Sequence, residues 1–337
     1  MYASDVIICF ICILLISILI RTIYNACRRG ITGKGEEHKR EFPFIEQLGK
    51  DKFRYSLSFR GEYTALTSQK GAKQLNNILE MSKKAMARLG KNFDRSDMAK
   101  TDVMYKSHIP NKVHTWPYEF YDDPRFGYAY IRYKTFQRYP EVYNLVDRAM
   151  SGNSNSIKRI KNNVKRGKPI RVVLIGGGPG YTTQSVIDAL SKYGSPKIVC
   201  LNTDGSDMLG SVSDIYGAKF ENIKFENVKR LMEVCDGADI IINSFAIEYF
   251  NDKLFIFSDI LKKTPTALIL INCASTRGRY MTEFYKMSSS TFRVTSLLSR
   301  NDMRQFMLST ERPGKINTNN VLYPNVPYDI GKKSNRR

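Results

Sequence analysis

The sequence predicts an α/β fold, in which a parallel sheet in the C-terminal half follows a mainly helical region and an apolar N-terminal helix. From residue 170 onward, short β-branched runs alternate with helix-length segments, which is typical of βαβ units whose sheet is covered on both faces. A glycine-rich turn follows the first of these runs. Residues 6–20 are apolar except for Ser17, and a run of this kind at a chain end indicates a membrane segment.

Composition limits the class of protein. The chain has 337 residues, which fits one large domain or two modest ones. Hydrophobic residues make up 42% of it and aromatic residues 12%, so a largely disordered polypeptide is excluded. The net charge of +21 favours polyanionic partners such as RNA or anionic lipid headgroups. The six cysteines form no CxxC pair outside the apolar N-terminus, so we expect neither a disulfide framework nor a bound metal.

The apolar run predicts a transmembrane anchor over residues 1–24. Spanning a bilayer takes about 20 residues, and residues 22–24 extend the run into the interface. A cleaved signal peptide, the rival interpretation, would carry positive charge before the run, whereas Asp5 precedes it and Arg21, Arg28 and Arg29 follow it. The positive-inside rule then predicts a single-pass membrane protein whose C-terminal domain is cytoplasmic.

The region between the anchor and the sheet divides by composition. Residues 25–50 are polar and predict a linker, and residues 51–168 predict a helical, aromatic and basic region. We expect a helix over Gln69–Leu89, where apolar residues recur at spacings of three and four. In residues 114–140, tyrosine, phenylalanine and arginine interleave. Such a stretch either binds single-stranded nucleic acid or forms a packed cap, and the cap is favoured because aromatic residues usually serve cores.

A basic ridge is expected directly before the sheet. No acidic residue lies between Arg148 and Arg171. The cations of the ridge are Lys158, Arg159, Lys161, Lys165, Arg166 and Lys168. A helix that presents them is either a solvated connector or a contact surface for RNA or anionic lipid headgroups, and the sequence leaves both interpretations open.

The sheet is expected within residues 169–312. Parallel strands are predicted at residues 170–175, 197–202, 223–226, 238–243 and 267–272. Two further extended runs, residues 292–298 and 303–309, are separated by a short turn and predict an antiparallel hairpin. Residues 313–337 form a basic tail, which we expect to fray from Tyr323 onward.

The turn after the first strand is the strongest sign of a ligand. Glycines let the backbone approach a ligand closely, and the helix that follows offers its free N–H groups and its positive dipole end. A dinucleotide fingerprint would need glycine where Tyr181 stands, which disfavours a nicotinamide oxidoreductase. Asp204 follows the second strand, where a carboxylate can accept hydrogen bonds from both hydroxyls of a ribose.

Three segments in this order, VVLIGGGPGYTT, IVCLNTDGSDML and GADIIINSFAIEYF, resemble motifs of class I S-adenosylmethionine-dependent methyltransferases over residues 170–310. The terminal hairpin is similar to that family's sixth and seventh strands. The resemblance implies a Rossmann-like sheet and S-adenosylmethionine as the cofactor. It implies that the methionine moiety of the cofactor is bound by Gly176, Gly177, Gly178 and Gly180, and the ribose by Asp204. It further implies that Ser206 and Met208 lie beside ribose and adenine, Asn227 at the adenine, and Ser244 near the transferred methyl. Ser206 and Met208 could equally be an ordinary helix start and a core residue.

The resemblance also implies catalytic candidates. Asn243 ends the fourth strand and would face the methyl group, and Glu248 and Tyr249 are the nearest bases, although each could equally cap the next helix. The family usually has an acidic residue where Leu174 stands, and the fourth strand lacks the NPPY or DPPY signature. The leading interpretation is therefore a membrane-anchored methyltransferase with RNA as a candidate acceptor. The alternative is a degenerate methyltransferase fold that serves as a membrane-tethered RNA-binding or scaffold module.

Overall fold

The computed structural model describes residues 43–56, 64–107, 118–250, 253–274, 278–288, 292–299, 303–319 and 322–324. The predicted membrane anchor, residues 1–24, lies outside the described residues. Within the described ranges, none of the helices combines the length and the apolar character that a bilayer crossing needs.

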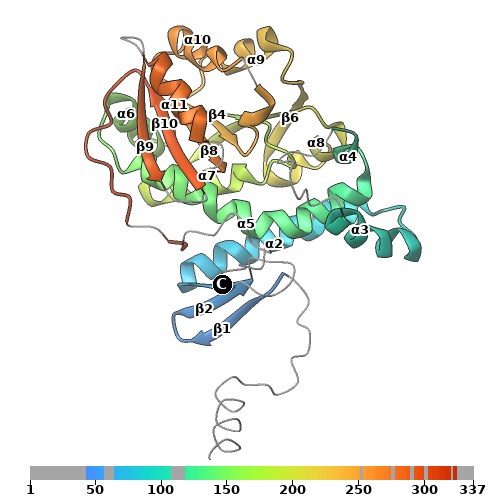
Figure 1. The fold of residues 1–337 in the computed structure, drawn as a ribbon. Coiled ribbons are helices and arrows are strands. Elements are labelled where there is room, and N and C mark those ends of the chain that lie inside the picture. Colours follow the sequence, from blue (N-terminus) through green and yellow to red (C-terminus); the bar gives the residue numbers. More distant parts are fainter. Residues whose placement is uncertain are drawn as a thin grey trace, which may run out of the picture. The chain divides into compact units, whose positions relative to one another are not determined.

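A seven-stranded sheet forms the centre of the fold (Figure 1). Its strands are β4 (Pro169–Ile175), β5 (Lys197–Asp204), β6 (Ala218–Asn222), β7 (Ile240–Ser244), β8 (Leu268–Ala274), β9 (Arg293–Ser299) and β10 (Met303–Ser309). They stand in the order β6-β5-β4-β7-β8-β10-β9. The first five of this order are parallel, and β10 runs antiparallel to both β8 and β9. This arrangement confirms the predicted α/β fold with a C-terminal antiparallel hairpin.

The third predicted strand is misplaced by several residues. The structure places β6 at Ala218–Asn222, whereas residues 223–226 were expected to be the strand. β6 is an edge strand whose alternate residues are polar, so it lacks the continuous apolar run by which the buried central strands were found. Ile223 and Phe225 are buried in the loop after β6, and this loop produced the misleading apolar signal.

The helices cover the sheet and the region before it. They are α2 (Gln69–Leu89), α3 (Arg95–Ser107), α4 (Tyr118–Tyr121), α5 (Pro124–Met150), α6 (Asn155–Lys165), α7 (Thr182–Leu190), α8 (Asp207–Gly210), α9 (Val228–Cys235), α10 (Phe255–Lys263) and α11 (Gly278–Met287), with short 3-10 turns η1 (Ser191–Tyr193), η2 (Ser213–Tyr216) and η3 (Ile247–Phe250). α2 has the predicted bounds. The short antiparallel strands β1 (Ile45–Gly49), β2 (Lys52–Ser56) and β3 (Thr64–Thr67) were not anticipated, because the sequence indicated a linker and helices there.

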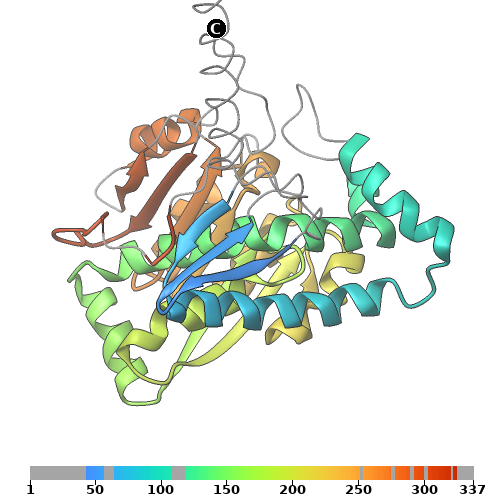
Figure 2. The ribbon, with the colours of Figure 1, turned by 90° about the horizontal axis from the view of Figure 1, so that it is seen from below.

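α5 carries the aromatic and basic stretch. The Asp123 carboxylate accepts a hydrogen bond from Arg125 N at 2.8 Å, and Pro124 occupies the first helical turn, where proline is tolerated. The helix packs against α2, α3 and α7 and contacts β8, and Figure 2 shows α2 and α5 running side by side. Phe126, Tyr133 and Phe136 are at most 4% exposed. The described part of this stretch is therefore a packed cap, which was the favoured interpretation.

The segment after β10 packs against the body instead of fraying throughout. Tyr323 is fully buried, and its ring meets Tyr55, Tyr139 and Tyr143 at centroid distances of 5.2–6.2 Å. The Tyr323 hydroxyl hydrogen-bonds to Gln74 Oε1 at 2.8 Å. The prediction that the tail frays from Tyr323 onward is therefore wrong at Tyr323 itself, which joins the small sheet to α2 and α5.

The basic ridge lies on and after α6, at the edge of the sheet where β4 begins. Ile157, Ile160 and Val164 bury one face of the helix. Two of the six cations are engaged: Arg159 forms an ion pair with Asp239, and Lys161 donates to Gly152 O at 2.9 Å. The remaining four are exposed, namely Lys158, Lys165, Arg166 and Lys168.

Candidate functional site

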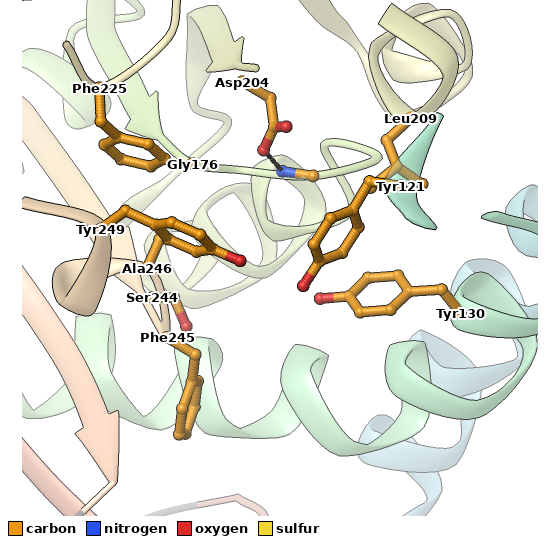
Figure 3. Close-up of a pocket in the computed structure, with 11 residues that line it drawn as sticks. Tyr121, Tyr130, Gly176, Asp204, Leu209, Phe225, Ser244, Phe245, Ala246 and Tyr249 are labelled. Atoms are coloured by element: carbon orange, nitrogen blue, oxygen red, sulfur yellow. Dashed lines mark hydrogen bonds between the residues drawn. The ribbon is translucent and has the colours of Figure 1, made fainter. Parts of the chain in front are cut away.

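A pocket opens at the carboxyl ends of β4, β5 and β7. β4 lies between β5 and β7, so the strand order reverses there, and open α/β sheets bind ligands outside such a switch point. The pocket is lined by Tyr121, Tyr130, Gly176, Gly178, Asp204, Leu209, Phe225, Ser244, Phe245, Ala246 and Tyr249 (Figure 3). The glycine turn, the aspartate after the second strand and the end of the fourth strand meet here, as the sequence predicts.

Backbone geometry explains the glycines of the turn. Gly176, Gly178 and Gly180 have φ values of 65°, 56° and 86°, a region that side chains disfavour. A Cβ at Gly176 would lie 2.5 Å from Ala246 Cβ, so glycine is the residue that fits. Gly177 adjoins a smaller cavity beside the pocket, and a Cβ there would lie 2.1 Å from Asn202 Oδ1. Gly180 packs against η2 and does not line the pocket.

Asp204 fixes the glycine turn. Its Oδ2 accepts a hydrogen bond from Gly178 N at 2.8 Å (Figure 3). Its Oδ1 accepts one from Ser206 N at 3.0 Å. Burial raises the pKa of Asp204 above 3.8, although hydrogen bonds from the backbone of Ser206, Gly178 and Gly205 act in the opposite direction. Each carboxylate oxygen has a further lone pair, so the group can accept hydrogen bonds from a ligand.

Ser206 and Met208 lie beside the pocket without lining it. Ser206 Oγ accepts a hydrogen bond from Leu209 N at 3.2 Å and thereby caps α8. The same hydroxyl donates to Tyr121 O at 2.9 Å, which ties α4 to this wall. Met208 is half-buried and packs against the main core, while Leu209 lines the pocket. Ser206 is thus a helix start and Met208 a core contact, the alternatives stated from the sequence.

Asn227 does not reach the pocket. Its side chain is exposed, and its Oδ1 accepts a hydrogen bond from Arg230 N at 3.2 Å, which caps α9. Phe225, two residues earlier, lines the pocket. The misplacement of the third strand hid this residue from the sequence analysis.

The three catalytic candidates occupy different environments. Asn243 is fully buried in β7, and its Nδ2 donates to Ile175 O at 3.2 Å, so its amide holds β7 to β4. Ser244 lines the pocket. Tyr249 also lines it, from η3, whereas the neighbouring Glu248 is half-buried outside the lining.

Aromatic rings make up much of the wall. Tyr121 of α4 and Tyr130 of α5 lie 5.8 Å apart between ring centroids, and Phe225 and Tyr249 stack at 5.2 Å with an interplanar angle of 8°. The hydroxyls of Tyr121, Tyr130 and Tyr249 point toward one another (Figure 3). Tyr121 and Tyr130 were not among the predicted site residues, although both belong to the aromatic stretch of residues 114–140.

Phe245 is held in a strained conformation at the end of β7. Its φ is 57°, and it is the only residue other than glycine with a positive φ among the described residues. Its backbone N donates to Asn272 O at 2.7 Å, and the Arg138 guanidinium lies 3.3 Å from the centroid of its ring. Strained backbone of this kind clusters at functional sites.

Leu174 occupies the position of the expected acidic residue. It is 1% exposed and lines the smaller cavity together with Tyr130 and Tyr181. Residue 174 therefore provides no carboxylate to bind a ligand. Among the described residues that line the main pocket, Asp204 is the one with a formally charged side chain.

No protein-family model and no curated protein matches the sequence. Solved structures similar to the chain include a putative class I S-adenosylmethionine-dependent methyltransferase from Listeria monocytogenes, with 9% identity and a TM-score of 0.37 over 74% of this chain and 92% of that one. The plantazolicin methyltransferase BpumL, in complex with S-adenosylhomocysteine, has 10% identity and a TM-score of 0.36 over 71% and 100%. A putative rRNA methylase from Clostridium thermocellum has 11% identity and a TM-score of 0.33 over 48% and 99%. The similarity to these structures is low, so we assign the α/β fold from the order and direction of the seven strands of the sheet.

Lys134 is a half-buried cation of α5. It lies one helical turn beyond Tyr130 on α5, and its Nζ donates to Gln137 Oε1 at 3.2 Å. Burial, reinforced by Arg138, lowers the pKa of Lys134 to about 7, while Glu141 acts in the opposite direction.

We predict that Lys134→Met stabilises the protein at pH 7. Lys134 holds its proton less readily in the folded chain than in the unfolded chain, where the pKa is near 10.5, so stability is lost as pH falls from 10.5 to about 7. Methionine removes this penalty, and the gain in unfolding free energy at pH 7 should be on the order of 1 kcal/mol. Urea unfolding at pH 7 and at pH 9.5 measures it, and the gain should shrink at the higher pH. Lys84→Met, at an exposed position of α2, is the control. A gain that does not depend on pH would contradict the prediction.

Proposed function

We propose that the chain binds S-adenosylmethionine in this pocket and transfers its methyl group to an acceptor. The single observation that carries the proposal is the Asp204 carboxylate, which is hydrogen-bonded to Gly178 N at the switch point of the sheet. The bound cofactor would supply an electrophilic methyl group. Because methyl transfer is one in-line displacement, positioning contributes most of the catalysis and a dedicated base is optional.

The residues present fit this cofactor. The close backbone approach at Gly176 and Gly178 suits the methionine moiety, and Asp204 can accept hydrogen bonds from the ribose hydroxyls. Leu209 and Phe225 offer apolar surfaces for the adenine ring, and both line the pocket. The Ser244 hydroxyl stands at the end of β7, where we place the transferred methyl group.

The second candidate function is a degenerate fold that binds RNA or partners without methyl transfer. Leu174 favours it, because the cofactor's ammonium group would lack a carboxylate there. The volume of the pocket favours it as well, since about 40 Å³ is far below the roughly 300–1,000 Å³ of ordinary ligand sites. Cofactor binding therefore requires the pocket to widen. Calorimetry of the full chain with S-adenosylmethionine, and with NAD as a negative control, separates the two functions.

We predict that Asp204→Ala weakens binding of S-adenosylhomocysteine about tenfold to a hundredfold, because hydrogen bonds to a charged group contribute roughly 1.5–3 kcal/mol. Asp207→Ala, at an exposed position of α8, is the matched control. The raised pKa of Asp204 adds a pH test: protonation removes acceptor lone pairs, so the affinity of the wild type should fall as acidification passes through a pKa above 3.8. Unchanged affinity with a lowered melting temperature would leave Asp204 a purely structural residue.

We further propose that the basic ridge binds polyanions such as RNA or anionic headgroups. The observation behind it is the four exposed cations next to β4. A variant carrying Lys158→Glu, Lys165→Glu and Lys168→Glu should bind single-stranded RNA more weakly, with a salt dependence flattened by about one unit per lost phosphate contact. Lys224→Glu with Lys229→Glu, two exposed positions near α9, is the control. Equal slopes for the ridge variant and the wild type would make the ridge a solvated connector.

Membrane anchoring through residues 6–24 is also a proposal, supported by the apolar run and the arginines that follow it. It places the ridge and the pocket on the cytoplasmic side. In sealed vesicles with the cytoplasmic face outward, added protease should digest the C-terminal domain. Protection of that domain would contradict the predicted orientation, and full extraction of the chain by carbonate would contradict the anchor.

A further inference from the structure

Three phenol hydroxyls converge over the glycine turn, and the proposed cofactor assignment by itself gives them no role. Tyr121 comes from α4, Tyr130 from α5 and Tyr249 from η3, so three separate elements deliver these groups to one place (Figure 3). The ring centroids of Tyr121 and Tyr130 lie 5.8 Å apart, and Tyr130 also lines the smaller cavity together with Tyr181.

We propose that the hydroxyl oxygens of Tyr121, Tyr130 and Tyr249 hold the sulfonium cation of S-adenosylmethionine and make the site prefer it to the uncharged product. This inference rests on the proposed function, because it assigns a specificity role within the same pocket. The carbons bonded to a sulfonium are polarised, and their hydrogens form weak hydrogen bonds to oxygen. A phenol oxygen retains lone pairs for such contacts when its own proton is donated elsewhere.

The electrostatics of the pocket agree with a cationic ligand at this place. Asp204 raises the pKa of Tyr121, Tyr130 and Tyr249, whereas the Arg138 guanidinium acts more strongly in the opposite direction on Tyr130, so the field of the carboxylate is least opposed at Tyr121 and Tyr249. Burial is the largest cause of each raised pKa, and it keeps the hydroxyls neutral. Neutral oxygens stabilise a cation without the desolvation penalty of a further buried charge.

The absence of an acid at residue 174 gives these oxygens added importance. With Leu174 in that wall, cationic recognition in this pocket depends on Asp204 and on the tyrosine oxygens. Methyl transfer breaks the bond from sulfur to the methyl carbon and leaves a neutral thioether, because the sulfur keeps the bonding electron pair. The contacts to the phenol oxygens then lose their electrostatic component, which favours release of the product.

The test is calorimetry of full-length wild type and of Tyr121→Phe, Tyr130→Phe, Tyr249→Phe and the triple variant, with S-adenosylmethionine and S-adenosylhomocysteine. Each single change should lower the preference for S-adenosylmethionine about twofold to fivefold, and the triple change roughly tenfold or more. Affinity for S-adenosylhomocysteine should stay within about twofold, because each substitution removes a hydroxyl and keeps the ring. Tyr216→Phe is the matched control, since Tyr216 is buried and its hydroxyl hydrogen-bonds to Ser82 away from the pocket.

An unchanged preference in the triple variant would overturn the inference, and so would an equal loss of affinity for both ligands, which would give the hydroxyls a purely structural role. Failure of the proposed function has a different signature, because the wild type would then bind neither ligand. Retained binding of S-adenosylhomocysteine in the variants, with reduced binding of S-adenosylmethionine, supports both.

Discussion

The pocket depends on how the end of β5 holds the glycine turn. Asp204 accepts a hydrogen bond from Gly178 N, and Asn202, one pleat earlier, donates from Nδ2 to Gly178 O at 2.8 Å. Both polar groups of one glycine are thus bound to a neighbouring strand, in a turn whose φ values are positive at three positions. A buried carboxylate is costly, as the raised pKa of Asp204 indicates, so its retention here needs compensation by hydrogen bonds. Backbone N–H groups provide part of this compensation, and a ligand with hydroxyl groups could provide more.

α5 connects the pocket to the rest of the body. Its first half delivers Tyr130 to the wall and places Arg138 against the ring of Phe245. Its second half carries Arg148, which is fully buried and hydrogen-bonds to Gln305 of β10. Asn144 Nδ2 donates to Tyr323 O at 3.0 Å. One helix therefore contacts the glycine turn, the end of β7, the terminal hairpin and the segment after it, so a displacement of α5 would alter the pocket and the core together.

The elements predicted well from the sequence are those that are determined by a short stretch of consecutive residues. Buried parallel strands give continuous apolar runs, and a glycine turn between a strand and a helix is visible in a dozen residues, so Gly176, Gly178, Asp204 and Ser244 were placed correctly. β6 was misplaced because an edge strand is half polar, and Phe225 was lost with it. Tyr121 and Tyr130 reach the pocket only because α4 and α5 dock across the sheet, and no pattern in the sequence specifies that docking. The family resemblance implied that Ser206 and Asn227 contact the cofactor, whereas their side chains cap helices.

The position of the basic ridge relative to the pocket limits how far the positive charges of the ridge can act on a ligand in the pocket. α6 leads into the amino end of β4, whereas the pocket lies at the carboxyl ends of the strands, so the two are at opposite edges of the sheet. Exposed charges separated by more than a Debye length of about 10 Å are largely screened at 0.1 M salt, so the ridge contributes little to the potential inside the pocket. A polyanion bound at the ridge would be tethered to the protein without being presented to Ser244 and Phe245. In the proposed reaction an acceptor would approach over the walls formed by α4, η3 and the end of β7, where the tyrosine hydroxyls and Ser244 provide polar groups. The proposed polyanion binding and the proposed methyl transfer therefore use opposite ends of the strands and can be tested separately.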